Sequence, residues 1–343
     1  MKNKTNILLI YTGGTIGMIK DYKTGALKAF NFDELVGNIP ELNQLDCSIK
    51  GISFEEPIDS SNMNPDHWAT IASMIEDNYK LYDGFVVLHG SDTMSYSASA
   101  LSFMLENLSK PVIFTGSQLP IGDLRTDAKE NLITSIQIAA LKEKGKPVVQ
   151  EVGLYFEYKL YRANRTTKIN AEHFEAFASL NHPPLVESGV HLKVHDSYLV
   201  KRSHKIKPLQ VHKKMDDNIA VLKLFPGLNR SVLKGILNIS GLKAVVLETY
   251  GAGNAPMDNW FLNELKEAID RGLHIINVTQ CSGGGVSMGH YETSEKLKEM
   301  QLINGKDITT EAAITKAMYL LGSNVSRKLF KTIFETSLRG EMH

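Results

Sequence analysis

The sequence predicts an α/β protein with two domains, and three observations support this prediction. The chain has 343 residues, which is enough for two hydrophobic cores of ordinary size. Short apolar runs alternate with segments of helical periodicity, as in domains built on a largely parallel sheet. This alternation lapses once, between about residues 190 and 216. We therefore expect a larger N-terminal domain over 1–192, a linker over 193–216 and a smaller α/β domain over 217–343.

The elements of the first domain follow from its apolar runs. We expect strands at 6–11, 47–58, 84–89 and 111–116, helices at 64–79, 97–108 and 127–141, and further strands, which could form a hairpin, within 148–169. The helix at 64–79 has Asn64 in the N-cap position and Pro65 at its first helical position. Asp127 and Glu130 have the spacing of a capping box at the start of the last helix.

The second domain repeats the same rhythm. We expect strands at 219–225, 243–249 and 273–279, and helices at 229–238, 258–271 and 310–321. Before it, basic residues and histidines gather where the helical pattern lapses. Because aromatic residues suited to stacking on bases are nearly absent there, a solvated linker or edge strands are favoured over a nucleic-acid-binding patch.

The composition excludes several classes of function. The 38 basic and 38 acidic residues cancel, so no overall field attracts nucleic acid or an anionic membrane. The two cysteines, Cys47 and Cys281, exclude a disulfide framework and have no zinc-like spacing. His89, His173 and His182 are scattered, so no metal site is expected. The first apolar run is too short for a signal peptide, and no run approaches the roughly 20 residues of a membrane helix. We expect a soluble cytoplasmic protein that binds a small molecule or another subunit.

Four expected strands of the first domain end in short polar clusters. These are TGGTIG (12–17), DSSN (59–62), HGSDT (89–93) and TGSQ (115–118). Each alone has a plain explanation, because Ser, Thr, Asp and Gly form turns and cap helices. Open α/β sheets, however, bind ligands beyond the carboxyl ends of their strands. Together the clusters predict a pocket rich in hydroxyls and bearing carboxylates, suited to a small zwitterionic ligand.

Two other interpretations of the glycine-rich segments are weaker. TGGTIG spaces its glycines as GGxxG, whereas a dinucleotide site needs GxGxxG, and GxxxxGK[ST] is absent from the chain. GVSMG (285–289) matches the GxSxG nucleophile elbow, but the expected strand ends several residues earlier. The histidines that follow are only His290, adjacent in sequence, and His343. Serine-hydrolase chemistry is therefore a weak alternative.

Several motifs together resemble one known family. At YTGGTIGM, HGSDTM, TGSQLP, YRANRTTK, ETYGAGNAP and NVTQCSGGG the sequence resembles the type I, cytoplasmic bacterial L-asparaginases, over essentially the whole chain. The TGGT loop and the HG[ST]DT turn are jointly very specific. The resemblance implies a larger and a smaller domain with the active site between them, and assembly as dimers or dimers of dimers. It also implies hydrolysis of asparagine to aspartate and ammonia without a cofactor.

The resemblance assigns four residues to the chemistry. Thr15, the second threonine of TGGT, matches the nucleophile that forms an acyl-enzyme with the side-chain carbonyl carbon of asparagine. A threonine hydroxyl needs a base to take its proton. Ser91 and Asp92 match a catalytic hydroxyl and carboxylate, and Lys168 of RTTK matches a buried lysine. In its uncharged form, Lys168 beside Asp92 could take this proton through Ser91.

The resemblance also assigns residues to substrate binding. Backbone N–H groups of the turn at 90–92 are candidates to stabilise the oxyanion. The loop after Asp59 matches the segment that holds the α-carboxylate, and Asp92 would also meet the α-ammonium group. Asn254 could reach the pocket of a neighbouring protomer. The expected binding residues are Asp59, Ser60, Ser61, Gly90, Ser117 and Asn254.

This chain departs from the family pattern at two positions near the chemistry. Most relatives have threonine where this chain has Ser91, which keeps the hydroxyl but lacks the β-methyl group that restricts χ1. We expect activity to survive this change, in full or reduced. The loop tyrosine that many relatives carry after TGGT is replaced by Ala26. Tyr22, out of register, and Tyr291 are both candidates to orient Thr15.

Three further expectations concern specificity and alternatives. Glu248 and Thr249 precede Tyr250 where some relatives carry the arginine of an allosteric asparagine site. A carboxylate cannot grip an α-carboxylate, so we expect this allostery to be absent or altered. Minor glutaminase activity is expected, because one methylene changes binding by only about 1–3 kcal/mol. An amidase subunit of a tRNA-dependent amidotransferase and a non-catalytic amino-acid sensor are the alternatives. Such subunits usually carry an extra N-terminal domain, and a sensor needs no nucleophile.

Overall fold

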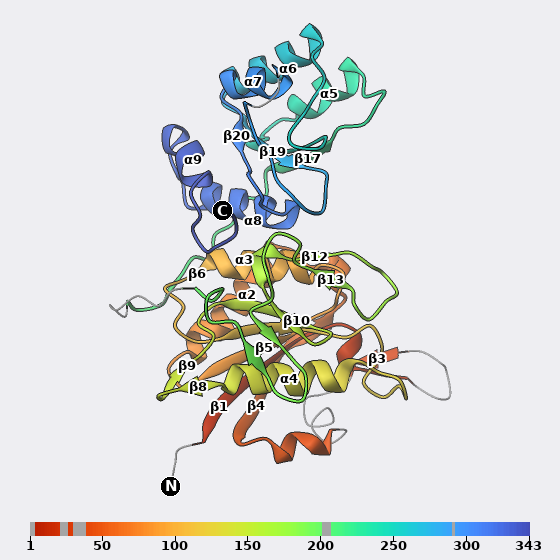
Figure 1. Ribbon diagram of the computed structural model, residues 1–343, viewed down its shortest axis with the longest axis vertical. Helices are drawn as coiled ribbons and strands as arrows, with labels where there is room; N and C mark the ends of the chain where they lie inside the picture. The colour runs from red at the N-terminus through yellow and green to blue at the C-terminus, as the bar shows by residue number, and fades with distance from the viewer. Residues whose placement is uncertain (1–3, 21–26, 30–38, 201–206, 290–291) are drawn as a thin grey trace. The chain divides into compact units, whose positions relative to one another are not determined.

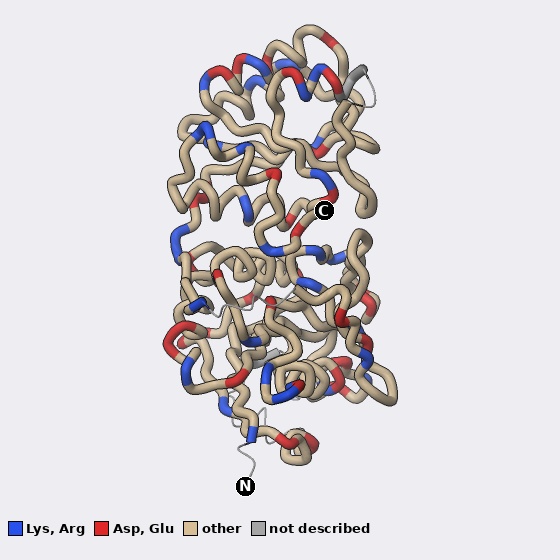
Figure 2. Tube along the Cα trace, turned by 60° about the vertical axis from the view of Figure 1, so that its left-hand side comes forward, with Lys and Arg blue, Asp and Glu red and all other residues tan. Residues whose placement is uncertain are grey.

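The structure, a computed structural model, describes residues 4–20, 27–29, 39–200, 207–289 and 292–343. The chain divides into two compact units, Met1–Lys213 and Lys214–His343 (Figure 1). Each unit has a sheet flanked by helices, so the expected α/β class is confirmed. Lysine, arginine and acidic residues are interspersed along both units (Figure 2). Among the described residues, no helix combines the length and the apolar character needed to cross a membrane.

The first unit is built on an eight-stranded sheet with the order β15-β14-β11-β10-β7-β5-β1-β4. Strands β4, β1, β5, β7 and β10 are parallel neighbours, and β11, β14 and β15 continue the sheet in antiparallel pairs. Their bounds are β1 (Thr5–Gly13), β4 (Cys47–Ile58), β5 (Gly84–Leu88), β7 (Val112–Thr115), β10 (Val152–Phe156), β11 (Lys159–Arg162), β14 (Val186–Glu187) and β15 (Lys193–Val194).

Among the described residues, three helices flank this sheet: α2 (Pro65–Asn78), α3 (Met94–Met104) and α4 (Ala128–Ala140). Figure 1 shows α4 lying along one face of the sheet. Strand β1, which lies between β5 and β4, is buried at every residue from Ile7 onward, because successive side chains point to opposite faces and both faces are covered. Ile7 and Leu9 pack in one core cluster with Leu132 of α4. The carboxyl ends of the parallel strands are thus held at fixed positions by a dry core.

Short two-stranded pairs complete the first unit. They are β2 (Met18–Lys20) with β3 (Leu27–Ala29), β6 (Leu105–Glu106) with β16 (Gln210–Val211), β8 (Lys142–Glu143) with β9 (Lys146–Pro147), and β12 (Thr167–Lys168) with β13 (Phe177–Ala178). The segment 193–216, expected as a linker, contains both β15 and β16, which pair with strands of this unit.

The second unit has a parallel sheet with the order β17-β18-β19-β20 and five helices among its described residues. Its apolar core gathers Leu222, Leu247 and Phe261 from strands and a helix. The strands are β17 (Ile219–Lys223), β18 (Ala244–Thr249), β19 (His274–Thr279) and β20 (Ile303–Asn304). The helices are α5 (Arg230–Leu237), α6 (Asn259–Arg271), α7 (Glu292–Glu299), α8 (Thr310–Gly322) and α9 (Arg327–Phe334).

Most expected elements are present, with two differences that have physical causes. The helix expected at 97–108 runs from Met94 to Met104, because the chain at 105–106 leaves it to pair with β16. The capping box at Asp127 and Glu130 is wrong. The Asp127 carboxylate accepts hydrogen bonds from the backbone N–H groups of residues 118 and 119, and makes no cap bond to its own helix. Asn64 does cap α2, accepting from two backbone N–H groups.

Candidate active site

The four polar clusters lie at one edge of the large sheet. They follow β4, β1, β5 and β7, which are consecutive parallel neighbours, so their carboxyl ends point the same way. The first cluster forms the 3-10 turn η1 (Thr15–Gly17) and the second forms η3 (Ser60–Asn62). The convergence expected from the sequence is therefore present in the structure.

Glycines allow three of these loops to approach one another closely. A Cβ atom on Gly14, whose φ is 87°, would lie 2.5 Å from the Gly90 Cα atom, and one on Gly90 would lie 2.5 Å from the Ser60 hydroxyl oxygen. Such distances leave no room for a side chain, so both positions need glycine. The Thr12 hydroxyl donates to a backbone carbonyl of β5 and ties the loop to the sheet. Thr15, the next residue after Gly14, is half-buried beside this junction.

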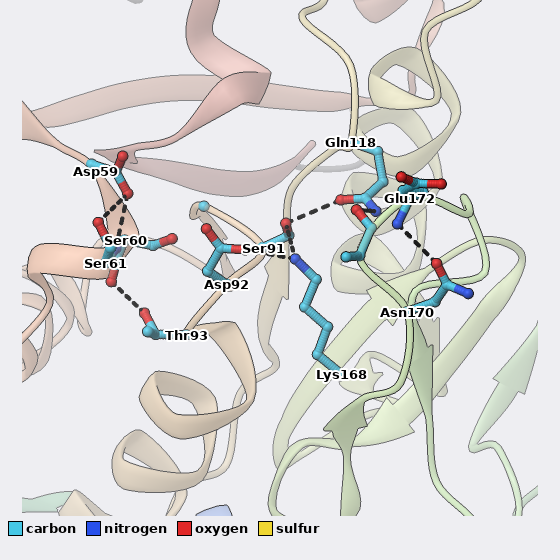
Figure 3. Close-up of polar contacts among 12 residues, drawn as sticks. Asp59, Ser60, Ser61, Ser91, Asp92, Thr93, Gln118, Lys168, Asn170 and Glu172 are labelled. Carbon is cyan, nitrogen blue, oxygen red and sulfur yellow. Dashed lines mark hydrogen bonds and ion pairs between the residues drawn. The ribbon is translucent and has the colours of Figure 1, made fainter.

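The turn after β5 is joined to β12 by a lysine (Figure 3). Lys168 Nζ donates to the Ser91 hydroxyl oxygen at 2.9 Å and to the Asp92 carboxylate at 2.7 Å. The Lys168 side chain is 18% exposed, whereas that of Asp92 is 65% exposed. The ammonium group is thus mostly withdrawn from water, while the carboxylate keeps a free face toward solvent. This arrangement brings together three of the four residues expected to carry the chemistry.

The second loop of the site holds a carboxylate at its rim. Asp59 Oδ1 accepts from the Ser61 backbone N–H and hydroxyl, each at 2.9 Å, and these bonds lower the pKa of the Asp59 carboxyl from its ordinary value. Ser60 is buried, and its carbonyl oxygen accepts from the Thr93 hydroxyl at 2.7 Å. This bond fixes the 59–62 loop against the turn that carries Asp92.

His89 stabilises the same turn through a hydrogen bond to its backbone. Its ring is fully buried, and Nδ1 lies 2.7 Å from the Gly90 carbonyl oxygen, so Nδ1 carries the proton. Burial lowers the pKa of His89 to about 4, and the ring is therefore neutral near pH 7. We assign His89 a structural role, because Nε2 is buried and meets no polar atom of the described residues.

The fourth cluster contributes a residue that the sequence analysis did not single out. The Ser117 hydroxyl, expected to bind substrate, donates to the Leu119 carbonyl at 2.6 Å and is buried. The neighbouring Gln118 instead reaches the site, where its Oε1 accepts from the Ser91 hydroxyl at 3.1 Å. The signal was present in the TGSQ motif, but spacing alone does not tell which of its side chains faces the turn.

The remaining expected residues lie in other places. Tyr22, Ala26 and Tyr291 fall outside the described residues. Asn254 belongs to the second unit, where its backbone bridges to Tyr250. Its expected role in the pocket of a neighbouring protomer stays a prediction.

The structure of the second unit bears on two sequence expectations, the altered allosteric site at Glu248 and the weak serine-hydrolase alternative at Ser287. Glu248 accepts from the Thr310 hydroxyl at 2.7 Å, which engages the carboxylate within its own unit. Strand β19 ends at Thr279, well before Ser287, so the strand–serine–helix succession of a nucleophile elbow is absent from this described segment. Within the described ranges, no three His, Cys, Asp or Glu side chains are grouped closely enough to hold a metal ion.

Comparisons with known proteins agree on one family. Residues 6–199 match the family described as "Asparaginase, N-terminal", and residues 218–334 match "Glutaminase/Asparaginase C-terminal domain". The chain is 42% identical to L-asparaginase 1 of Escherichia coli K12 over 340 residues, which cover 99% of this chain and 98% of that protein.

Two solved structures bear on the fold. The crystal structure of L-asparaginase I from Vibrio cholerae superposes with a TM-score of 0.90 at 39% identity, covering 99% of both chains. The thermostable L-asparaginase from Thermococcus kodakarensis superposes with a TM-score of 0.87 at 30% identity, again covering 99% of both chains. Because the two family matches together span most of the chain and these relatives align over nearly their full length, the protein belongs to the asparaginase family.

Proposed function

We propose that this protein hydrolyses L-asparagine to L-aspartate and ammonia through an acyl-enzyme on Thr15. The observation that carries the proposal is the contact of Lys168 with both Ser91 and Asp92, in a turn that abuts the glycine loop of Thr15. A lysine, a hydroxyl and a carboxylate in contact form a proton-transfer group, and such a group suits activation of a weak hydroxyl nucleophile.

The first half of the reaction forms an ester. The Thr15 oxygen attacks the side-chain amide carbon of asparagine, and its proton passes through the Ser91 hydroxyl to an uncharged Lys168. Backbone N–H groups of the turn at 90–92 stabilise the oxyanion, a contribution of roughly 3 kcal/mol per donor. The carbon–nitrogen bond then breaks as the leaving nitrogen takes the proton held by Lys168, passed back through Ser91, and departs as ammonia; Lys168 is then uncharged again.

The second half hydrolyses the ester. Water attacks the acyl carbon, its proton follows the same path, and the Thr15 oxygen leaves with a proton as aspartate is released. Binding of the substrate is assigned to Asp59, Ser60 and Ser61 at its α-carboxylate side and to Asp92 at the α-ammonium group. The exposure of Asp92 supports this last assignment, because a carboxylate that binds a ligand has to be accessible from solvent.

Assembly and location are further parts of the proposal. Similarity to type I asparaginases supports a dimer or a dimer of dimers and a cytoplasmic location, with minor activity on glutamine. Light scattering of the purified protein measures the first of these directly.

Ammonia release from L-asparagine and L-glutamine, measured side by side over a wide concentration range, tests the proposed reaction. We expect faster release from asparagine, and loss of turnover in Thr15→Ala with the fold intact. Near-normal turnover in Thr15→Ala would contradict the acyl-enzyme. Binding of asparagine without turnover would favour a sensor, and release of ammonia only with a charged tRNA present would favour a component of an amidotransferase.

A further inference from the structure

We propose that Gln118 is a positioning residue that fixes the Ser91 hydroxyl oxygen in front of Lys168. This inference rests on the proposed function, since it assigns a task to Gln118 within that reaction. The Ser91 hydroxyl lies between two side chains, with Lys168 Nζ at 2.9 Å and Gln118 Oε1 at 3.1 Å (Figure 3).

The orientation of the Gln118 amide follows from its other contacts. Its Nε2 atom donates to the carbonyl oxygens of Ala171 at 3.2 Å and His173 at 3.0 Å. Carbonyl oxygens only accept, so the amide group cannot be flipped without losing both bonds. Oε1 therefore faces Ser91, and the hydroxyl of Ser91 is the donor in that bond.

Because the Ser91 hydroxyl donates its proton to Gln118, the lone pairs of its oxygen are available to accept from Lys168. A serine hydroxyl has one proton, which is given to Gln118, and the oxygen accepts from the ammonium group. Serine also lacks the β-methyl group that restricts χ1 in threonine, so its oxygen has more positions open to it. The bond to Gln118 selects one of these positions, and the hydroxyl proton can still turn about the Cβ–Oγ bond toward an uncharged lysine without moving the oxygen.

Gln118 can restrain Ser91 because it is itself held at both ends. Its backbone N–H donates to the buried Asp127 carboxylate at 2.9 and 3.1 Å. The carbonyls that hold its side chain come from a loop closed by Asn170, whose Oδ1 accepts from the backbone N–H groups of Glu172 and His173 at 2.8 and 2.9 Å. This loop directly follows Lys168, so Gln118 links the two sides of the proton-transfer group.

A double-mutant cycle separates this task from a general structural one. Gln118→Met keeps the length of the side chain and removes its hydrogen bonds. We expect it to lower kcat for asparagine about tenfold when residue 91 is serine, the effect of one lost hydrogen bond of ordinary strength. In the Ser91→Thr background, the same change should lower kcat much less, because the methyl group then restrains χ1. KM should change little in either background. Gln137→Met, on the exposed side of α4, is the matched control and should change neither quantity.

Two outcomes would overturn the proposal: no loss of kcat with serine at 91, or the same loss in both backgrounds. If Gln118→Met does not fold, Asn170→Ala loosens the carbonyls that hold the amide and should show the same dependence on residue 91.

Crystal structures of the wild type and Gln118→Met give a readout independent of turnover. One Ser91 rotamer is expected in the wild type and more than one in the variant, whereas a single unchanged rotamer would contradict the proposal. An inactive wild type with this pattern would refute the proposed function alone.

Discussion

Among the lysine–carboxylate pairs of the two units, one in each unit has a buried or largely buried lysine, and these two pairs are built differently. Lys316 of α8 contacts Glu341, and both side chains are fully buried. Its Nζ also donates to the carbonyl oxygens of Phe334 and Thr336, each at 2.7 Å, so all three ammonium protons have acceptors. Lys168 gives two protons to Ser91 and Asp92, and among the described residues no third acceptor meets it.

The difference distinguishes a structural pair from the pair that is proposed to take part in the chemistry. A buried ammonium with every proton satisfied cannot exchange a proton without breaking the packing around it. Burial raises the pKa of Glu341, but the Lys316 charge and two backbone N–H groups outweigh it, and the pKa of this carboxyl is lowered overall. Lys168 keeps a free donor and an exposed partner, which is what a group that takes and returns protons needs.

The largest effect is expected when the proposed chemical pair is broken. Lys168→Met should reduce turnover of L-asparagine by about a thousandfold, as loss of a general acid–base group does. The free energy of unfolding should change by no more than about 1 kcal/mol, because Asp92 remains largely solvated. Product formation and urea unfolding of the same preparation measure both quantities. If Lys168→Met were strongly destabilised yet remained active per folded molecule, Lys168 would have the same structural role as Lys316, and the proposal would be contradicted.

Breaking the buried pair should have the opposite pattern. Lys316→Met leaves the Glu341 charge buried without its partner, and we expect the free energy of unfolding to fall by about 3–5 kcal/mol. Turnover per folded molecule should remain near the wild-type value. The double variant Lys316→Met/Glu341→Gln is the control, and it should recover part of the loss because no buried charge is left. Equal stability of the single variant and the wild type would refute the structural role.

Mild acid should lower the free energy of unfolding by a smaller amount, through buried histidines and not through the Lys316–Glu341 pair. Burial lowers the pKa of His89 to about 4, and burial followed by the Arg327 charge lowers that of His274 to about 4. An unfolded histidine takes up its proton near pH 6.5. Each neutral ring therefore contributes fully to the free energy of unfolding above pH 6.5. This contribution is lost as the pH falls toward 4, because the unfolded chain takes up a proton that the folded protein does not. For the fully buried His89 the loss is roughly 3 kcal/mol.

The Lys316–Glu341 pair should persist through most of this window, since the pKa of Glu341 lies below its ordinary value. Urea unfolding at several pH values between 7 and 4 measures the slope. His89→Asn keeps a donor for the Gly90 carbonyl and should flatten part of the slope. The same slope in this variant and in the wild type would show that the loss has another origin.

The sequence was sufficient for the parts of the site that depend on where the strands end. Apolar runs ending at Thr12, Asp59, His89 and Thr115 predicted strands, and parallel neighbours place their ends at one edge.

Features that depend on side-chain orientation could not be predicted in this way. Gln118 faces the site because two carbonyls of the loop after Lys168 hold its amide, and no local pattern encodes that contact. Asp127 satisfies the spacing of a cap, yet its carboxylate is engaged by the backbone of another loop. Lys316 lies in a largely apolar helix, and its burial depends on acceptors from Phe334, Thr336 and Glu341, which come from a later part of the chain.

Chemical rescue of Lys168→Ala is the most direct test of the central claim that this lysine carries protons. Formation of L-aspartate is measured while small primary amines of different basicity are added, with Thr15→Ala as the control. We predict a rate that rises with amine concentration and depends on the basicity of the amine, and no rescue of Thr15→Ala. A folded Lys168→Ala protein that binds asparagine but shows no dependence on added amine would contradict the account.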